Sequence, residues 1–537
     1  MFYAMLTATI FTVCSLFAAA ARGDAPTATV DSGVLIGTTT LLPTATACIN
    51  KFLGVPFAVS PPGRFVPPVR EQPFGERNAT TYSAACVQEI TNVVTQDVFN
   101  NPAPKESEDC LYLNVYAPST PVHPDNKRSV LFWIYGGSLQ FGNAVFGFPI
   151  APNQPVNARN LGFLDQRAGL DWVQRNIHAF GGDPNKVTIF GESAGAFSVD
   201  ALLTSYPRTV SPPFRGAILE SGQYAYRQPA PADPYGAWTF LTKALNCSSN
   251  YENDLDCVKA ASVDQIRGIV SNNSLAFNPV VDNVTLVQNP AAERRAGNIA
   301  RVPVLAGTNA QEGRIFELGQ NNVTSFINAT ITQDPSAIAQ IAALYPVGPG
   351  GFASAYDAIS QIFTEYFFQC PQAAMTNDSA VTKIPTWRYY FNATFVNTQG
   401  LQGLGAYHSS EIPIVFRTYS VTATQAYTTT QEYALAQYMQ HTWARFAKNP
   451  QGGPGWNAVD VGVPATILAG ANVNTTGGLY LDANSQRTSG TYNLAVLGSV
   501  RNVMSSGATI VPQESLDYRC VLYEAAYNAI RNSPSGP

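Results

Sequence analysis

One serine in this 537-residue chain stands in a pattern typical of an activated nucleophile. Ser193 is the centre of the segment Gly-Glu-Ser-Ala-Gly at 191–195, which follows an apolar run at 187–190 and leads into a run of small residues at 194–199. A strand, a sharp Gly-x-Ser-x-Gly turn and a helix hold a serine hydroxyl exposed above a sheet, with the N–H groups of the helix start directed at the reacting centre. Because a chain with 41 glycines can contain the five residues by chance, it is the flanking strand and helix that favour a nucleophile over a structural serine.

A serine hydroxyl needs a base to remove its proton, and histidine is the usual base at neutral pH. The chain has four histidines. Enzymes with this turn carry serine, acid and histidine in that order along the chain, which excludes His123 and His178. His441 lies in a helical pattern, whereas His408 lies in a loop before an apolar run. Since loops at the edge of a sheet often carry catalytic groups, we predict that His408 is the base.

The acid that orients the histidine should lie between Ser193 and His408. Glu312 follows a predicted buried strand at 301–307 and is the preferred candidate. Its carboxylate would hold the imidazole and stabilise its charged form. Asp282 is the alternative, but the glycan acceptor Asn283 comes directly after it, which suggests that this position is exposed.

The reaction also needs N–H donors for the negatively charged oxygen of the intermediate. A strand-like run at 129–135 leads into two glycines and a serine. We predict that the backbone N–H groups of Gly137, Ser138 and Ala194 form this oxyanion hole, although a glycine pair after a strand is by itself more often a simple turn. Glu192, next to the nucleophile, either tunes the local field or is a hydrogen-bonded structural carboxyl.

The arrangement of the remaining chain indicates one large unit that positions these groups. We find no linker, repeat or low-complexity block, and strand-like and helix-like runs continue from residue 30 to residue 530. A single α/β domain over 24–537, with long insertions, therefore fits better than a string of modules. A chain of this size can bury a core without a metal.

The first 21 residues are predicted to be a secretory signal rather than part of the fold. Residues 2–21 are apolar and uncharged and end in four alanines before a polar segment, as a signal peptide does. A membrane anchor is the competing interpretation of this segment, and no later run is apolar for long enough to cross a bilayer. The net charge of −5 and the absence of basic clusters argue against a nucleic-acid partner.

Only 12% of the residues are charged, so other polar groups and glycans must solvate the surface. The Asn-x-Ser/Thr acceptors for such glycans are Asn78, Asn246, Asn272, Asn283, Asn322, Asn328, Asn377, Asn392 and Asn474.

With these features the chain resembles the type-B carboxylesterase/lipase family, which includes the cholinesterases. The matching segments, besides those around Ser193, Glu312 and His408, are FLGVPFA (52–58), PPGRF (61–65), SEDCLYLNV (107–115), IYGG (134–137), LDQR (164–167) and FGGDP (180–184). The resemblance covers essentially the whole mature chain and is closest in character to secreted fungal members. It implies an α/β-hydrolase fold with a mostly parallel central sheet flanked by helices, a Ser193–Glu312–His408 triad, small ester substrates and no cofactor or metal.

The same resemblance implies a disulfide pattern, which spacing alone leaves open. Without Cys14, in the signal, seven cysteines remain. The implied pairs are Cys86–Cys110, Cys247–Cys257 and Cys370–Cys520. Cys48 would then be a free thiol, expected to be a small buried apolar residue.

Two departures from the family bear on the substrate. Ser138 stands where the family usually has a third glycine. In cholinesterases the loop between Cys86 and Cys110 carries a tryptophan that binds choline, but here the only aromatic residue of that loop is Phe99. We therefore do not expect cation–π recognition of choline esters.

The same loop is a longer lid in the interfacial lipases of this family. Val87, Ile90, Val94 and Val98 recur at nearly helical spacing, which allows a short amphipathic cover over the site. We prefer the simpler interpretation, in which this segment is an ordinary surface helix packed on the core.

The sequence thus predicts a secreted carboxylesterase that acts on soluble esters. Alternatives are an interfacial lipase or sterol esterase, an esterase or acyltransferase of secondary metabolism, and a catalytically silent binding protein. The oligomeric state is not predicted.

Overall fold

The computed structural model describes residues 25–40, 48–89, 93–100, 102–120, 123, 126–139, 144–226, 233, 235–247, 254–401, 403–419, 428–459, 493–498 and 508–532. The predicted signal segment 1–21, the glycan acceptor Asn474 and Ile90 of the predicted cover lie outside these residues.

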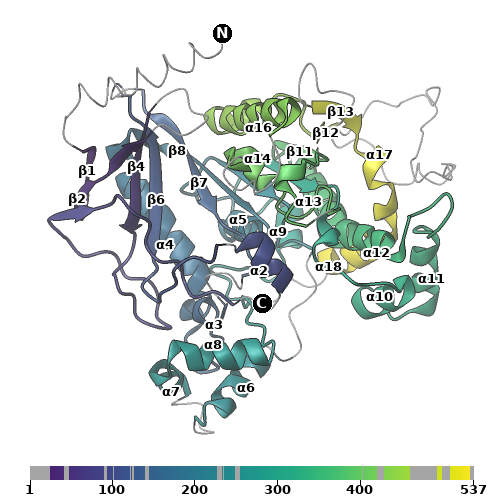
Figure 1. Ribbon diagram of the computed structural model, residues 1–537, viewed down its shortest axis with the longest axis horizontal. Coiled ribbons are helices and arrows are strands. Elements are labelled where there is room, and N and C mark those ends of the chain that lie inside the picture. Colours follow the sequence, from purple (N-terminus) through teal and green to yellow (C-terminus); the bar gives the residue numbers. More distant parts are fainter. Residues whose placement is uncertain are drawn as a thin grey trace.

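A seven-stranded sheet forms the centre of the molecule (Figure 1). Its strands, in spatial order, are β13 (Ala508–Pro512), β12 (Asn493–Leu497), β11 (Thr386–Phe391), β10 (Val304–Asn309), β9 (Gly216–Glu220), β8 (Gly182–Glu192) and β7 (Arg128–Ile134). Strands β7 to β12 pair in parallel and only β13 is antiparallel. The predicted mostly parallel sheet is therefore confirmed.

Two small sheets precede the central one and lie beside its β7–β8 end (Figure 1). One contains β1 (Thr27–Val30), β2 (Gly33–Ile36) and β5 (Glu76–Asn78), and the other contains β3 (Thr38–Thr40), β4 (Ile49–Pro56) and β6 (Tyr112–Pro118).

Helices surround the central sheet. They are α2 (Val93–Phe99), α3 (Ala144–Gly147), α4 (Leu161–Asn176), α5 (Ala194–Ser205), α6 (Gly236–Ala244), α7 (Asp254–Ala260), α8 (Val263–Asn272), α9 (Pro290–Ala296), α10 (Val323–Thr330), α11 (Pro335–Ala343), α12 (Ala355–Thr364), α13 (Cys370–Val381), α14 (Ile412–Phe416), α16 (Thr430–Lys448), α17 (Glu514–Asp517) and α18 (Glu524–Asn532). Shorter helical segments are η1 (Val156–Ala158), η2 (Ile177–Phe180), η3 (Glu312–Arg314), the π-helical η4 (Glu365–Gln369), η5 (Val396–Thr398), η6 (Pro450–Gly452) and η9 (Tyr518–Tyr523). None of the helices in the described ranges has the length and apolar character needed to cross a membrane.

The inner strands are buried on both faces because helices cover both. Every residue of β9, β10 and β11 is buried, as is usual for a parallel sheet between two helical layers. Successive side chains point to opposite faces. In β8, Ile189 packs in a core with α4, α5 and α13, whereas Phe190 packs in a second core with α14 and α16.

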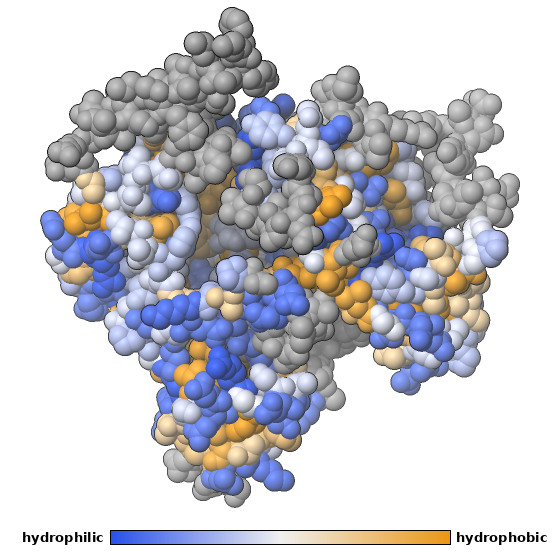
Figure 2. Space-filling model, viewed as in Figure 1, coloured by the Kyte–Doolittle hydropathy of each residue, from blue (hydrophilic) through white to orange (hydrophobic). Residues whose placement is uncertain are grey.

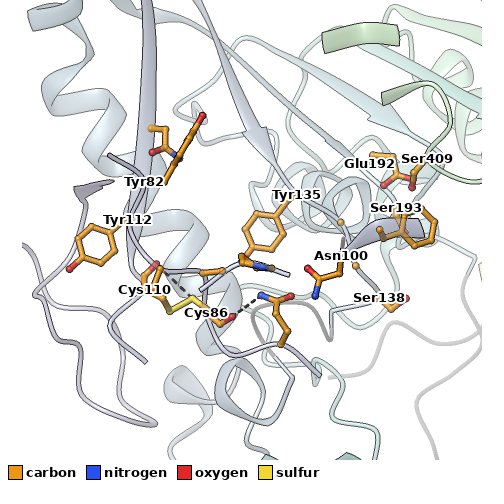
Figure 3. A pocket seen from close by; sticks show the side chains of 18 of the residues that line it. Tyr82, Cys86, Asn100, Cys110, Tyr112, Tyr135, Ser138, Glu192, Ser193 and Ser409 are labelled. Atoms are coloured by element: carbon orange, nitrogen blue, oxygen red, sulfur yellow. Dashed lines mark hydrogen bonds between the residues drawn. A yellow bond between two sulfur atoms is a disulfide. The ribbon is translucent and has the colours of Figure 1, made fainter. Parts of the chain in front are cut away.

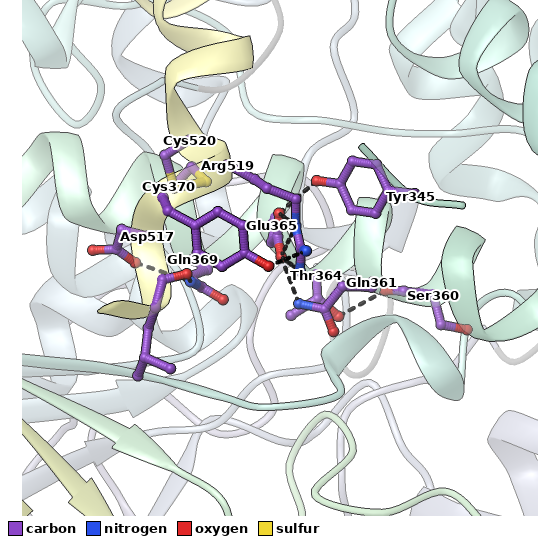
Figure 4. A network of polar contacts seen from close by, with 12 residues as sticks. Tyr345, Ser360, Gln361, Thr364, Glu365, Gln369, Cys370, Asp517, Arg519 and Cys520 are labelled. Carbon is purple, nitrogen blue, oxygen red and sulfur yellow. Dashed lines mark hydrogen bonds and ion pairs between the residues drawn. A yellow bond between two sulfur atoms is a disulfide. The ribbon is translucent and has the colours of Figure 1, made fainter. Parts of the chain in front are cut away.

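A buried polar network holds the C-terminal segment against α12 and η4 (Figure 4). The Arg519 guanidinium donates to both carboxylate oxygens of Glu365, at 2.7–3.0 Å. The Tyr345 hydroxyl donates to the same carboxylate at 2.5 Å. The Cys370–Cys520 disulfide joins the same two parts of the chain. Because the Glu365 carboxylate is fully enclosed, its charge depends on Arg519 for compensation.

The structure contains the three implied disulfides, Cys86–Cys110, Cys247–Cys257 and Cys370–Cys520. The expectation for Cys48 was wrong. Cys48 is disulfide-bonded and only half-buried, with a partner outside the described residues.

Seven of the predicted glycan acceptors are exposed, namely Asn78, Asn246, Asn272, Asn283, Asn322, Asn328 and Asn392. Asn377 differs, because it lies half-buried within α13 and its side-chain oxygen is buried. Asn377 is thus less accessible to a glycan than the seven exposed acceptors.

Candidate active site

Ser193 lies at the sharp turn between β8 and α5. Its backbone has φ 55° and ψ −122°, an unusual conformation for a non-glycine residue that costs roughly 1–3 kcal/mol. The neighbouring glycines make the turn possible: a methyl group at Gly195 would lie 2.1 Å from the carbonyl oxygen of Ile134, and one at Gly222 would lie 2.3 Å from that of Ser193. The Gly-x-Ser-x-Gly spacing thus reflects how closely β7, β8 and α5 approach one another.

Glu312 and His408 meet beyond the ends of two neighbouring strands. Glu312 begins η3 after β10, and His408 lies in the loop after β11. The backbones of Gln311 and Tyr407 form a parallel bridge that brings the two segments together. His408 Nδ1 lies 2.6 Å from Glu312 Oε2, and both side chains are buried. Because a carboxylate only accepts, Nδ1 donates this hydrogen bond and Nε2 is the basic nitrogen of the neutral ring.

The Nε2 atom of His408 makes no hydrogen bond within the described part of the chain. Both His408 and Ser193 line one cavity, and hydrogen bonds between such groups often tighten only when substrate binds. Nε2 also lies 3.2 Å from Oε1 of Glu192, an atom that accepts a hydrogen bond from the Ser409 hydroxyl at 2.6 Å. Burial lowers the pKa of His408, but the carboxylates of Glu192 and Glu312 outweigh it and hold that pKa above its usual value.

The predicted oxyanion donors lie at the end of β7 and the start of α5. Gly137 and Ser138 both have positive φ, 110° and 57°, and both line the cavity with Ser193. Ser138 therefore keeps the left-handed conformation that a third glycine would adopt freely, at a cost of roughly 1–2 kcal/mol. Ala194 opens α5, where N–H groups lack partners within the helix. The substitution of glycine by Ser138 thus leaves the backbone of this loop in a glycine-like path.

Three further buried carboxyls surround the site, and two of them were missed from the sequence. Glu192 and Glu220 are register partners at the ends of β8 and β9, and Glu411 lies three residues after His408. Burial raises the pKa of Glu192 to about 7 and that of Glu220 to about 8, and it also raises the pKa of Glu411. The only feature of the sequence that could have drawn attention to Glu220 is its position, because it is a charged residue at the end of an apolar strand.

The other histidines and the alternative acid lie elsewhere. His123, His178 and His441 are exposed. Asp282 is buried rather than exposed as expected, and it accepts hydrogen bonds within its own turn, from the backbone N–H groups of 284–286 and the Thr285 hydroxyl. Its carboxylate is thus committed to that turn.

The cavity that Ser193 and His408 share has a volume of about 560 Å³ and is shown in Figure 3. Aromatic side chains form much of its wall, from Tyr82, Tyr112, Tyr135, Phe99 and Phe316. A space of this size is typical of a site for a drug-sized molecule. No group of three His, Cys, Asp or Glu side chains in the described ranges is arranged to hold a metal ion.

The predicted cover over the site corresponds to α2. Val98 and Phe99 of α2 pack against a small apolar cluster of Ile315, Leu404 and Tyr407. Phe99 also lines the cavity. Figure 2 shows hydrophobic residues gathered on this face between the positions that α2 and α12 occupy in Figure 1.

Comparison with known proteins places this geometry in a family. The family model described as the carboxylesterase family matches residues 24–145 and 139–468. The chain belongs to this family. The family's α/β-hydrolase fold agrees with the seven-stranded, mostly parallel sheet, so the predicted fold class is confirmed.

Three relatives show the range of this carboxylesterase family. The chain is 30% identical over 457 residues to a chlorogenic acid esterase of Aspergillus niger, covering 76% of this chain and 80% of the relative. It is 30% identical over 501 residues to secreted lipase 1 of Botryotinia fuckeliana, covering 76% and 84%. It is also 30% identical over 470 residues to an acetylcholinesterase of Bungarus fasciatus, covering 76% of each chain. The chain is thus a carboxylic ester hydrolase of a family that acts on small-molecule esters.

Proposed function

We propose that the chain is a serine carboxylesterase that hydrolyses esters through an acyl-enzyme. Ser193 attacks the ester carbonyl, while His408 takes the hydroxyl proton and passes it to the leaving alcohol. Glu312 holds the imidazole through Nδ1, and water then releases the acid by the same route. The observation that carries this proposal is the 2.6 Å contact between His408 Nδ1 and Glu312 Oε2, with His408 lining the same cavity as Ser193.

The oxyanion of the intermediate would be bound by the N–H groups of Gly137, Ser138 and Ala194. Removing one such donor typically costs about 10²–10³-fold in rate. The positive φ values at residues 137 and 138 support this role, because they turn the backbone at the end of β7 within the cavity.

We also propose that the protein is secreted. A relative named as a secreted lipase covers 76% of the chain. Three disulfides and seven exposed glycan acceptors also support an oxidising, extracellular setting.

The test of the proposed chemistry is a rate series on nitrophenyl esters of increasing acyl length. Ser193→Ala should lower kcat by at least about 10⁴-fold, with Ser205→Ala, at the other end of α5, as the matched control. Hydrolysis of short, soluble esters at rates that depend on Ser193 would support the esterase. Equal, slow turnover by the wild type and Ser193→Ala would instead indicate a catalytically silent binding protein.

An interfacial lipase is the second candidate, and α2 is the observation that favours it. Phe99 of α2 reaches the cavity, and Phe316 and Leu318 in the segment after Glu312 are exposed. Apolar surface at the mouth of a site can bind a lipid interface. A sharp rise in rate when the ester passes its micelle concentration would favour the lipase, and a smooth saturation curve would favour the esterase.

A further inference from the structure

The cavity extends well beyond the nucleophile, and its far end has a distinct wall. In Figure 3 Glu192, Ser193 and Ser409 lie at one end, and Tyr82 and Tyr112 lie at the other, near the Cys86–Cys110 disulfide. Tyr135 and Asn100 lie between the two ends. An ester positioned at Ser193 would therefore direct one of its halves past Tyr135 toward these two tyrosines.

The stretch of the cavity from Tyr135 to the far end offers aromatic surface together with polar groups that have no partner among the described residues. The Tyr112 hydroxyl is already bonded to Ser60 and Asp109, at 2.5 and 2.9 Å, so the ring is what Tyr112 contributes to the wall. The Tyr135 hydroxyl makes no hydrogen bond with any described residue. The Asn114 side chain accepts from the Gly54 N–H at 2.9 Å through its oxygen, which leaves its amide nitrogen available to a ligand. These groups are ready to bond a ligand that itself carries donors and acceptors.

The same wall disfavours other classes of ligand. A long alkyl chain would cover the Tyr135 hydroxyl and the Asn114 amide without replacing their hydrogen bonds to water, which is unfavourable for binding. An anion would find no lysine or arginine among the described residues that line the cavity. A choline-like cation would not find a tryptophan in the Cys86–Cys110 loop to bind it.

We infer that the stretch of the cavity from Tyr135 to Tyr82 and Tyr112 is a subsite for a hydroxylated aromatic ring of the ester. The ring stacks on the tyrosine faces, as aromatic pairs do, and its hydroxyl exchanges a hydrogen bond with Tyr135. The inference rests on the proposed function and adds a substrate class to it, namely uncharged esters that carry a phenolic ring in one half.

The test compares matched esters that differ in one hydroxyl or in the ring. Methyl para-hydroxyphenylpropanoate, methyl phenylpropanoate and methyl octanoate place the difference in the acyl half. The acetates of para-hydroxybenzyl and benzyl alcohol place it in the alcohol half. One half of the ester, acyl or alcohol, faces the tyrosines. In the series that varies this half, we expect kcat/KM to be about five-fold higher for the ester with the ring hydroxyl than for the ester without it, because one neutral hydrogen bond contributes an effect of about this size. The octanoate should be the poorest acyl substrate.

Tyr135→Phe is the decisive variant, because it removes one oxygen and keeps the ring. It should reduce the ratio of kcat/KM between hydroxylated and unsubstituted esters to about one, whereas Tyr433→Phe, an exposed tyrosine of α16 outside the cavity, should leave that ratio as in the wild type. If Tyr135→Phe does not fold, the wild-type series decides by itself.

Equal rates on hydroxylated and unsubstituted esters in both halves, or preference for the octanoate, would overturn the subsite. If Ser193-dependent hydrolysis of nitrophenyl acetate persists in that case, the proposed function stands and only the subsite fails. If Ser193→Ala hydrolyses every ester as fast as the wild type, the proposed function fails, and the subsite with it.

Discussion

Replacing Glu312 by glutamine should lower kcat about 10⁴-fold, as the corresponding aspartate-to-asparagine change does in a serine-protease triad, because it reverses the hydrogen bond to His408. Oε1 of Glu312 accepts the Asn309 N–H at 2.6 Å, and Oε2 faces His408 Nδ1 at 2.6 Å. In the glutamine variant the amide oxygen must remain on the Asn309 N–H, since two donors cannot face each other. The amide NH₂ then faces Nδ1 and donates to it, which places the imidazole proton on Nε2, the atom that must take the proton of Ser193.

The predicted size of the effect follows from the enclosure of the pair. Glu312 is 0% exposed and His408 is 3% exposed, so water cannot replace the lost carboxylate. A drop of 10⁴-fold corresponds to about 5.4 kcal/mol at about 1.36 kcal/mol for each factor of ten. A charge-assisted hydrogen bond alone contributes about 1.5–3 kcal/mol, so the remainder must come from the unfavourable tautomer.

Single-turnover kinetics on nitrophenyl acetate would measure acylation directly, with circular dichroism to show that the variant is folded. Glu312→Asp is the matched control: it keeps the charge and the donor direction at Nδ1, and its loss in kcat should be much smaller than that of Glu312→Gln. A folded Glu312→Gln enzyme within tenfold of wild-type kcat would refute the reasoning.

Two further predictions concern charge in the buried interior. Glu192→Gln should move the acid limb of the pH profile of kcat/KM to lower pH, because only the neutral imidazole can accept a proton and the Glu192 carboxylate helps to raise the pKa of His408; an unchanged limb would contradict this. Glu365→Gln should lower the free energy of unfolding by about 3–5 kcal/mol, since it leaves Arg519 buried without its partner. Urea unfolding followed by fluorescence would measure it, with exposed Glu524→Gln as control, and an unchanged midpoint would count against it.

The parts of the site that could be predicted from the sequence are those whose signals are local. The turn at Ser193 depends on glycines within a few residues, and these are needed because β7, β8 and α5 approach closely. Glu312 and His408 each follow a strand of a parallel sheet, whose carboxyl ends share one edge. Their order along the chain was enough to propose that they meet, and the structure places them in contact.

The remaining features depend on contacts between distant segments. Tyr82, Tyr112 and Tyr135 form one wall only because β6, β7 and the segment before Cys86 lie together in the fold, and no spacing in the sequence records this. Glu220 lies beside Glu192 because β9 pairs with β8 in one particular register. The disulfide at Cys48 is likewise a contact between segments that spacing in the sequence does not fix.

Covalent labelling of the nucleophile tests the central claim most directly. The purified protein would be treated with a fluorophosphonate, digested and mapped by mass spectrometry while residual hydrolysis of nitrophenyl acetate is followed. If Ser193 is the nucleophile, one adduct per chain should form on its hydroxyl in step with the loss of activity, and Ser193→Ala should form none. Loss of activity with the adduct on another residue, or undiminished hydrolysis by a chain fully labelled at Ser193, would contradict it.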